Sequence, residues 1–259
     1  NRALFRQYRA LAASPETATL DAPRRKVLDN ALRDFRLGGA ELDTAAQARF
    51  SAIKEELSAL SAKFSQNVLD ATDGWSLVEE EEARLAGVPA DVRRAARAAA
   101  ERDGLEGWKL TLQMPCYLPV QTYAEDRALR ETLYRASAQR ASELADPALD
   151  NTANIDRILA LRAELAALLG FASYADYSIA TKMADAPADV LAFLRDLAAK
   201  ARPYAVKDRQ ALETFAREQL GIEALQAWDL AFVADRLKQS RYSYSGQEVK
   251  EYFTEPKVL

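Results

Sequence analysis

A single apolar stripe with helical spacing runs through residues 50–68. Its members recur at alternating steps of three and four positions: Phe50, Ile53, Leu57, Leu60, Phe64 and Val68. This spacing places the six side chains on one face of an α-helix. Thr44 and Gln47 have the residue types and spacing of a capping box, so we predict a helix from about residue 44 to 71. A helix of that length is too long for one short neighbour to bury, which favours a fold of several long helices.

The same stripe could instead belong to a self-associating coiled coil. It spans only about three heptads, whereas stable coiled coils repeat the pattern for longer. Polar residues also flank it, namely Ser58, Ser61 and Ser65. We therefore interpret residues 44–71 as a helix of a bundle.

Prolines and glycines mark where further helices start and stop. Proline stands where a first helical turn tolerates it at Pro15, Pro23, Pro89 and Pro187. The pairs Gly170–Phe171 and Gly221–Ile222 are typical of Schellman ends. Between these marks we predict helices near residues 2–12, 23–37, 89–102, 125–143, 152–169, 173–180, 187–220, 228–240 and 246–252. Pro203 should kink or split the helix over 187–220, because proline removes a backbone hydrogen bond.

Two short segments alternate apolar and polar residues with period two, as strands do. They are residues 75–79 and 108–113. We expect them to pair across the intervening helix and form a small sheet packed on helices. The predicted fold class is mainly α, a multi-helix lobe with long antiparallel helices and a small two-stranded β element.

The chain of 259 residues contains no histidine and one cysteine, Cys116. Histidine is the usual general base near neutral pH and the commonest zinc ligand. Its absence excludes Ser–His and Cys–His nucleophile systems, H-E-x-x-H zinc sites and the Glu-x-x-His di-iron bundle. A single cysteine cannot form a thiolate zinc cage or an internal disulfide, and it suits a reducing compartment. The chain therefore has very little with which to perform hydrolysis.

The net charge of −4 and the pI near 5.2 come from acidic and basic residues that are interspersed throughout. The basic triplet Arg24–Lys26 has Asp21 and Asp29 nearby and is interpreted as a solvated helix face. We therefore expect no nucleic-acid partner. The N-terminal residues lack the apolar core of a signal peptide, and no stretch approaches the ~18 apolar residues of a membrane helix. We expect no membrane association and a cytoplasmic location.

Two groups of acidic residues could hold a cation. The run Glu79–Glu82 could be a cation site or a catalytic carboxylate pair, but we favour a strand end and a helix start, where negative charge is stabilised. Asp146, Asp150 and Asp156 lack calcium-loop spacing, and we expect them to start turns and helices.

The segment Met114–Pro119 is unusual because it holds two prolines directly after a predicted strand. These prolines favour an extended path, and we interpret the segment as a structural turn. Cys116 would need a base to act as a nucleophile, and the usual base is absent. Three tyrosines near the C-terminus could line a peptide groove, although we favour core packing: Tyr242, Tyr244 and Tyr252.

A charged run in the helix predicted over 125–143 comprises Arg127, Arg130, Glu131, Arg135 and Arg140. Glu131 and Arg135 form an i,i+4 pair, which favours an exposed or interlobe helix face over an anion site. Gly104–Gly107 matches no phosphate-binding fingerprint. We therefore assign no catalytic and no metal-binding residue, and the substrate-binding residues stay unknown.

The sequence of Leu112–Val120, LQMPCYLPV, resembles the thimet oligopeptidase/oligopeptidase A family of zinc metallopeptidases. Further segments resemble the family in its order: Asn30–Gly38, Asn67–Thr72, Ile158–Arg162, Leu168–Phe171, Ala180–Ala184, Trp228–Asp229 and Tyr252–Phe253. The resemblance covers nearly the whole chain and looks strongest to the bacterial oligopeptidase A branch.

This resemblance implies a cytoplasmic zinc metalloendopeptidase that acts on short peptides in a deep channel between two mostly helical lobes. It also implies a zinc site built from H-E-x-x-H and a downstream glutamate, which activate water. This chain has no H-E-x-x-H motif. We expect residues 1–259 to be a non-catalytic α-helical region, truncated or proteolysed from a larger peptidase, with a small β-containing subregion at about 74–123.

Our first hypothesis is that the chain builds channel wall and lobe and is inactive alone, with zinc in the parent enzyme but none bound here. Its expected partners are short peptides and the missing catalytic C-terminal half. The exposed truncation surface should cause self-association, or disordered segments around residues 74–123. The alternative hypothesis is a stand-alone helical module that binds peptides or proteins.

Overall fold

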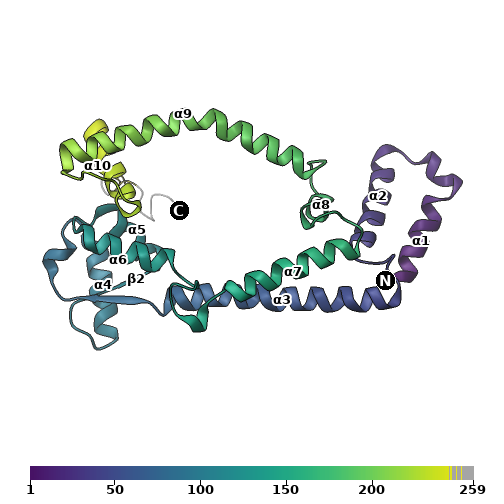
Figure 1. The fold of residues 1–259 in the computed structure, drawn as a ribbon, viewed down its shortest axis with the longest axis horizontal. Helices are drawn as coiled ribbons and strands as arrows, with labels where there is room; N and C mark the ends of the chain where they lie inside the picture. Colours follow the sequence, from purple (N-terminus) through teal and green to yellow (C-terminus); the bar gives the residue numbers. More distant parts are fainter. Residues whose placement is uncertain (245, 247–248, 250–251, 253–259) are drawn as a thin grey trace. The chain divides into compact units, whose positions relative to one another are not determined.

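The computed structural model describes residues 1–244, 246, 249 and 252. These residues form helices joined by short loops, together with one small sheet, so the mainly α prediction is confirmed (Figure 1). They divide into two compact units, Asn1–Phe64 with Ala153–Asp196 and Ser65–Thr152 with Leu197–Leu259. The boundary falls within two long helices, α3 (Thr44–Asp73) and α9 (Pro187–Leu220).

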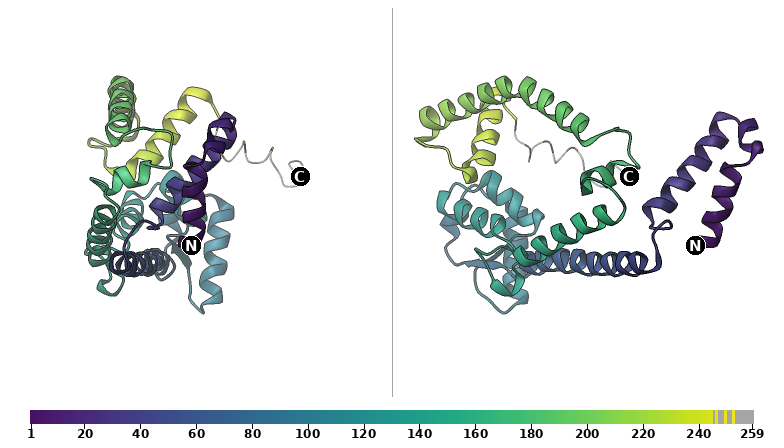
Figure 2. Two further views of the ribbon diagram at one scale, coloured as in Figure 1. Left: turned by 90° about the vertical axis from the view of Figure 1, so that its right-hand side faces the viewer. Right: turned by 45° about the vertical axis from the view of Figure 1, so that its right-hand side comes forward.

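The first unit contains two helical pairs. Besides the first parts of α3 and α9, its elements are α1 (Arg2–Ala12), η1 (Pro15–Thr19), α2 (Ala22–Leu37), α7 (Thr152–Leu168) and α8 (Tyr174–Ile179). Helices α1 and α2 form a hairpin, which the right-hand view of Figure 2 shows clearly. Phe5 is buried in this hairpin, with its ring centroid 5.6 Å from that of Phe35.

Helix α3 packs along α7 through the predicted apolar stripe. Phe50 and Ile53 on α3 form a buried cluster with Leu161 and Leu165 on α7. Burying four such side chains contributes several kcal/mol to folding, at about 1.5–3 kcal/mol for each. The helix begins at Thr44, and its capping side chain is Asp43 in place of the predicted Thr44, because the Asp43 carboxylate accepts the Ala46 N–H at 2.8 Å. An ionised aspartate suits this position, where the helix dipole favours negative charge.

The second unit combines the sheet with short helices and the remaining parts of α3 and α9. Its further elements are β1 (Ser76–Glu79), η2 (Glu82–Leu85), α4 (Ala90–Arg102), β2 (Trp108–Thr111), α5 (Met114–Tyr123), α6 (Arg127–Ala138), η3 (Pro147–Leu149), η4 (Ala227–Asp229) and α10 (Leu230–Tyr242). Strands β1 and β2 pair antiparallel across α4, with Leu77 opposite Leu110, as predicted. Leu110, Val120, Leu129 and Leu133 lie together in the core of this unit.

Helix α5 replaces the extended turn predicted over Met114–Pro119, so that prediction is wrong. Pro115 lies in the first turn, where its missing N–H costs nothing. The N–H of Tyr117 bonds to the Gln113 carbonyl at 2.8 Å, which starts the helix ahead of Pro119. Pro119 then removes one later backbone bond, and the complete burial of Val120 and Ala124 offsets this loss.

Helix α9 continues through Pro203 as one element, so the proline does not split it. The helix is exposed from residue 191 to 210, and water can therefore satisfy the carbonyl that Pro203 leaves free. Helix α6 ends at Ala138, earlier than predicted, and Ala141 follows with a left-handed φ of 51°. Most residues of the helix predicted at 246–252 lie outside the described part of the chain. Within the described part of the chain, no helix is both long and apolar enough to span a membrane.

Candidate binding pocket

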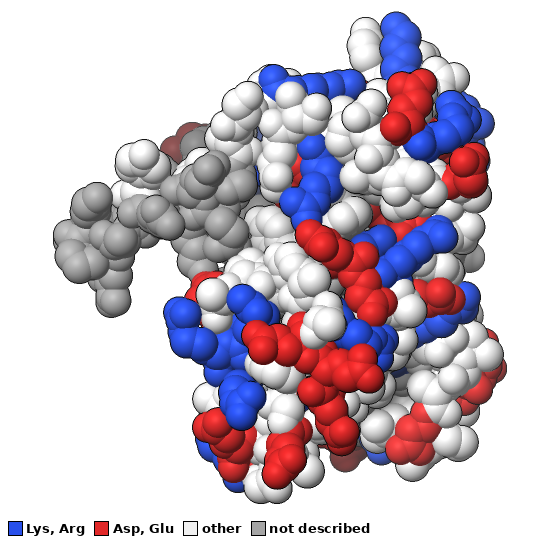
Figure 3. Space-filling view, turned by 90° about the vertical axis from the view of Figure 1, so that its left-hand side faces the viewer, with Lys and Arg blue, Asp and Glu red and all other residues white. Residues whose placement is uncertain are grey.

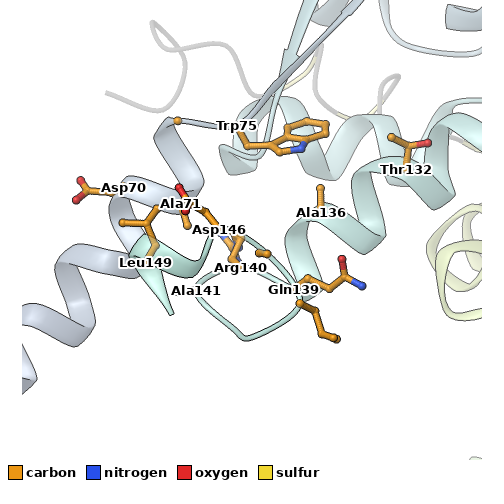
Figure 4. Close-up of a pocket in the computed structure, with 13 residues that line it drawn as sticks. Asp70, Ala71, Trp75, Thr132, Ala136, Gln139, Arg140, Ala141, Asp146 and Leu149 are labelled. Atoms are coloured by element: carbon orange, nitrogen blue, oxygen red, sulfur yellow. The ribbon is translucent and has the colours of Figure 1, made fainter. Parts of the chain in front are cut away.

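A pocket with a volume of about 460 Å³ lies within the second unit. The end of α3, the start of the β1 segment, α6 and the connection that follows α6 line it (Figure 4). Trp75 lies on one side, and Arg140 and Gln139 lie on another. The Trp75 indole also packs against the buried core of the unit, which fixes its position. Ala71, Ala136 and Leu149 are among the other apolar residues that line it.

Arg140 is the cationic group of this pocket and is half-buried. Its Nη1 donates to the Thr72 hydroxyl at 2.7 Å, and its Nε donates to the Ser137 carbonyl at 2.9 Å. Both acceptors are neutral. Among the residues that the structure describes, no carboxylate lies within ion-pair distance of this guanidinium. The two hydrogen bonds therefore fix the orientation of the Arg140 side chain. They leave its positive charge without an ion-pair partner among the described residues.

Two aspartates stand at the exposed rim of the pocket. The Asp70 carboxylate accepts a hydrogen bond from Gln66 Nε2 at 2.7 Å and projects outward from α3 in Figure 4. The Asp146 carboxylate accepts the Ala148 N–H at 2.9 Å and so caps η3. The pocket thus presents one cationic group on its wall and the Asp146 carboxylate at its rim, while the Asp70 carboxylate points away from it.

A buried pair of asparagines holds the connection after α6 against α3. Asn67 Nδ2 donates to Asn151 Oδ1 at 3.0 Å, and both residues are 1% exposed. The Asn151 N–H then bonds to the carbonyl of Ala141, the residue with left-handed backbone. Because buried hydrogen bonds of this kind are costly to break, the pocket wall is preformed.

The acidic run Glu79–Glu82 is structural, as predicted from its position. Glu79 ends β1, is 5% exposed and pairs with Arg84 at 2.7 Å. Glu82 begins η2 and pairs with Arg93 at 3.0 Å. These arginines therefore pair with two of the four carboxylates of the run.

The remaining acidic candidates and Cys116 have structural positions. The Asp150 carboxylate accepts from the Thr152 N–H at 2.9 Å, so it starts α7 in the way that Asp146 starts η3. Asp156 is exposed and lies inside α7 and not at its start, so the prediction that it starts a helix is wrong. Cys116 Sγ accepts the Thr111 N–H at 3.4 Å, and burial raises the pKa of its thiol. A protonated, partly buried thiol is a poor nucleophile.

The charged run on α6 corrects one prediction. Glu131 and Arg135 form the expected i,i+4 pair at 2.7 Å. Arg130, however, is 1% exposed, and its Nη2 lies 2.9 Å from Asp229 Oδ1. Arg127 reaches the same carboxylate at 2.7 Å, so an exposed face is the wrong interpretation for Arg130. The partner lies far along the chain and has no local spacing signal, which is why the sequence did not indicate it.

The C-terminal tyrosines do not pack in a core. Tyr242, Tyr244 and Tyr252 are 65%, 45% and 72% exposed, so the favoured core interpretation is wrong. The ring centroids of Tyr242 and Tyr244 lie 6.4 Å apart, and neither tyrosine lines the pocket beside Arg140. A peptide groove at these tyrosines stays a prediction.

The residues present do not fit a zinc site. The sequence has no histidine, and its one cysteine is the partly buried Cys116. In the described part of the chain, no group of three or more cysteine, aspartate or glutamate side chains gathers as metal ligands would.

On the face that Figure 3 draws, acidic and basic side chains are interspersed without a broad patch of one sign.

Comparison with known proteins gives the same family as the sequence segments. The model of peptidase family M3 matches residues 120–259. Oligopeptidase A of Escherichia coli K12 is 46% identical over 258 residues, which are 99% of this chain and 38% of that protein. Probable cytosolic oligopeptidase A of Arabidopsis thaliana is 38% identical over 269 aligned positions, which cover 100% of this chain and 38% of the relative.

Dipeptidyl carboxypeptidase of Escherichia coli K12 is 31% identical over 260 aligned positions, again 100% of this chain and 38% of the relative. The chain thus spans 38% of the length of each of these relatives. The predicted resemblance to the oligopeptidase A group is confirmed. The chain belongs to peptidase family M3.

Proposed function

We propose that this chain forms a non-catalytic wall and lobe of a zinc metalloendopeptidase that hydrolyses short peptides in the cytoplasm. One observation carries the proposal: a member of a peptidase family contains no histidine in 259 residues. Zinc peptidases of the expected type take two histidine ligands from H-E-x-x-H, and this sequence has no histidine to supply them. The residues that hold the zinc and its activated water would then lie in polypeptide outside this sequence.

The described residues support a framework role. Buried ion pairs and capped helices fix the backbone, as at Asp229 and Asp43, while the cysteine is protonated and two glutamates of the acidic run pair with arginines. We treat residues 1–259 as one non-catalytic helical region of the peptidase, with a β-containing subregion at about 74–123. Its partners would be short peptides and the catalytic part of the enzyme.

The chain should self-associate when the catalytic part is absent. Near the start of α9, Leu191, Phe193 and Leu194 are 48%, 66% and 50% exposed, and exposed apolar groups of this kind favour association. Light scattering should show oligomers that dissociate in a variant with serine at these three positions. A monomeric native chain over the micromolar range would contradict this part of the proposal.

The most direct genetic test reads the coding sequence past codon 259. A downstream H-E-x-x-H in the same frame supports the peptidase framework. Co-expression of both regions should then yield a product that cleaves a quenched fluorescent peptide. A stop codon at position 260 would contradict the proposal.

A stand-alone peptide-binding module is the second candidate. The preformed pocket beside Arg140 favours it, because all of its lining residues lie in one compact unit. A stop codon after residue 259, together with peptide binding by the purified chain, would support this candidate over the first.

A further inference from the structure

We infer that the pocket beside Arg140 binds the ends of a short zwitterionic peptide, with the carboxylate on Arg140 and an apolar side chain against Trp75. The choice of a peptide rests on the proposed function. The charge pattern that the ligand must match rests on the pocket alone.

Arg140 provides the carboxylate site. A guanidinium has five N–H donors, and the two bonds from Nε and Nη1 use only two of them. The Thr72 hydroxyl and the Ser137 carbonyl therefore set its orientation and leave the Nη2 end for a ligand, with no carboxylate from the described residues competing for it. Arginine binds carboxylates through paired N–H groups, and partial burial strengthens such a bond.

Trp75 provides the apolar contact. Its indole faces the pocket opposite Arg140, and Ala71, Ala136 and Leu149 complete a wall without charge. The volume of about 460 Å³ lies within the usual range of small-molecule sites, roughly 300–1,000 Å³. Such a pocket can hold a dipeptide or the end of a longer peptide, and it is too small for a folded chain.

Asp146 decides which kind of anion fits. A phosphate or another multiply charged anion would meet the Asp146 carboxylate at the rim, and like charges repel. A ligand that also carries an ammonium group would instead be attracted to it. A carboxylate and an ammonium on one small apolar molecule describe a short peptide with free ends, so a zwitterion fits better than a simple anion.

Titration of the intact 259-residue chain with three matched ligands tests this inference. The ligands are the dipeptide Ala-Leu, its C-terminal amide and its N-acetyl derivative, measured by calorimetry and by tryptophan fluorescence. Ala-Leu should bind most tightly. The amide should bind at least about tenfold more weakly, because it loses a charge-assisted hydrogen bond. The acetylated peptide should bind severalfold more weakly, and inorganic phosphate should not displace Ala-Leu.

Variants of two arginines, one on α6 and one just after it, separate the pocket from general charge effects. Arg140→Gln should weaken Ala-Leu binding at least about tenfold and abolish the difference between acid and amide, while Arg140→Lys should retain part of it. Arg135→Gln is the matched control, since Arg135 lies near the end of α6, a short distance along the chain before Arg140, and is outside the pocket and paired with Glu131. Circular dichroism verifies that each variant is folded. The titration of the native chain with the three ligands tests the inference even if a variant does not fold.

Equal binding of acid and amide, or no binding of Ala-Leu at millimolar concentration, would overturn the inference. A loss of binding in Arg135→Gln as large as in Arg140→Gln would do the same. These failures are distinguishable from failure of the proposed function. A downstream H-E-x-x-H with no binding here would leave the peptidase framework standing, whereas a stop codon with binding would leave the pocket standing.

Discussion

At the scale of the residue, Asp229 joins α6 to the segment that begins α10. It is fully buried, and its carboxylate accepts hydrogen bonds from Arg127, Arg130 and the N–H of Gln226. The Arg130 guanidinium also lies 4.2 Å from the centroid of the Phe232 ring on α10. Since both charges of the Arg130–Asp229 pair are buried, each depends on the other for compensation.

Asp229→Ala should therefore destabilise the chain strongly. The substitution leaves the buried Arg130 guanidinium without its carboxylate, and breaking a buried pair in this way costs about 3–5 kcal/mol. Urea unfolding at pH 7 measures the change in free energy. Glu213→Ala is the control, because Glu213 forms an exposed i,i+4 pair with Arg209 and should have a far smaller effect. Similar losses in the two variants would contradict the assigned role of Asp229.

The same carboxylate should make stability depend on acid pH. Burial by itself would raise the pKa of Asp229, but hydrogen bonds from Arg127, the Gln226 N–H and Arg130 outweigh burial and lower it below the ordinary 3.8. The stabilisation is therefore complete above the unfolded-state pKa and is lost as pH falls through the folded-state pKa. Below pH 4, the native chain should lose its advantage over Asp229→Asn, as urea unfolding between pH 7 and 3 can show. Parallel profiles would rule out this linkage.

Local residue pairs could be predicted, and distant ones could not. Glu131 and Arg135 lie one helical turn apart, so their spacing alone indicated the pair that the structure shows. Arg130 has the same local surroundings but pairs with a residue 99 positions away. Its burial depends on how η4 and α10 pack on α6, and no sequence period records that contact. The pocket beside Arg140 was missed for the same reason, because α3 and α6 form it together.

At the scale of the element, α5 is the helix that the sequence did not predict. Its two prolines have opposite consequences, because Pro115 lies in the first turn and Pro119 lies inside the helix. The periodic stripe of α3 and the alternation in β1 and β2 were sufficient to predict those elements. In α5 the two prolines argue against a helix when the sequence is considered alone. Which residues of α5 are buried depends on tertiary packing.

Pro119→Ala should stabilise the chain by about 1–3 kcal/mol. Alanine restores a backbone N–H that can reach the Pro115 carbonyl, and the cost of proline inside a helix is about 3 kcal/mol before the entropy of the unfolded chain is counted. Pro115→Ala is the matched control and should bring no gain, because an N–H at that position has no helical partner. Urea unfolding compares the two variants. A loss of stability in Pro119→Ala would show that the ring contributes more through packing than it costs.

At the scale of the whole molecule, two observations bear on what this chain contributes: it belongs to family M3, and it contains no histidine. The chain aligns with relatives over essentially its full length, yet it spans only 38% of theirs. The family could be predicted from ordered segments such as Leu112–Val120, because several matches in order are far more specific than one. We therefore propose that this chain supplies framework and peptide contact, while other polypeptide carries out peptide-bond cleavage.

One assay tests this division of labour most directly. The purified chain is dialysed against zinc-containing and then zinc-free buffer, its metal content is measured, and it is incubated with a quenched fluorescent peptide. The account predicts less than about 0.1 zinc per chain and no cleavage above the buffer control, since a zinc site of this class needs about three protein ligands. One zinc held per chain, together with cleavage that a chelator abolishes, would contradict it.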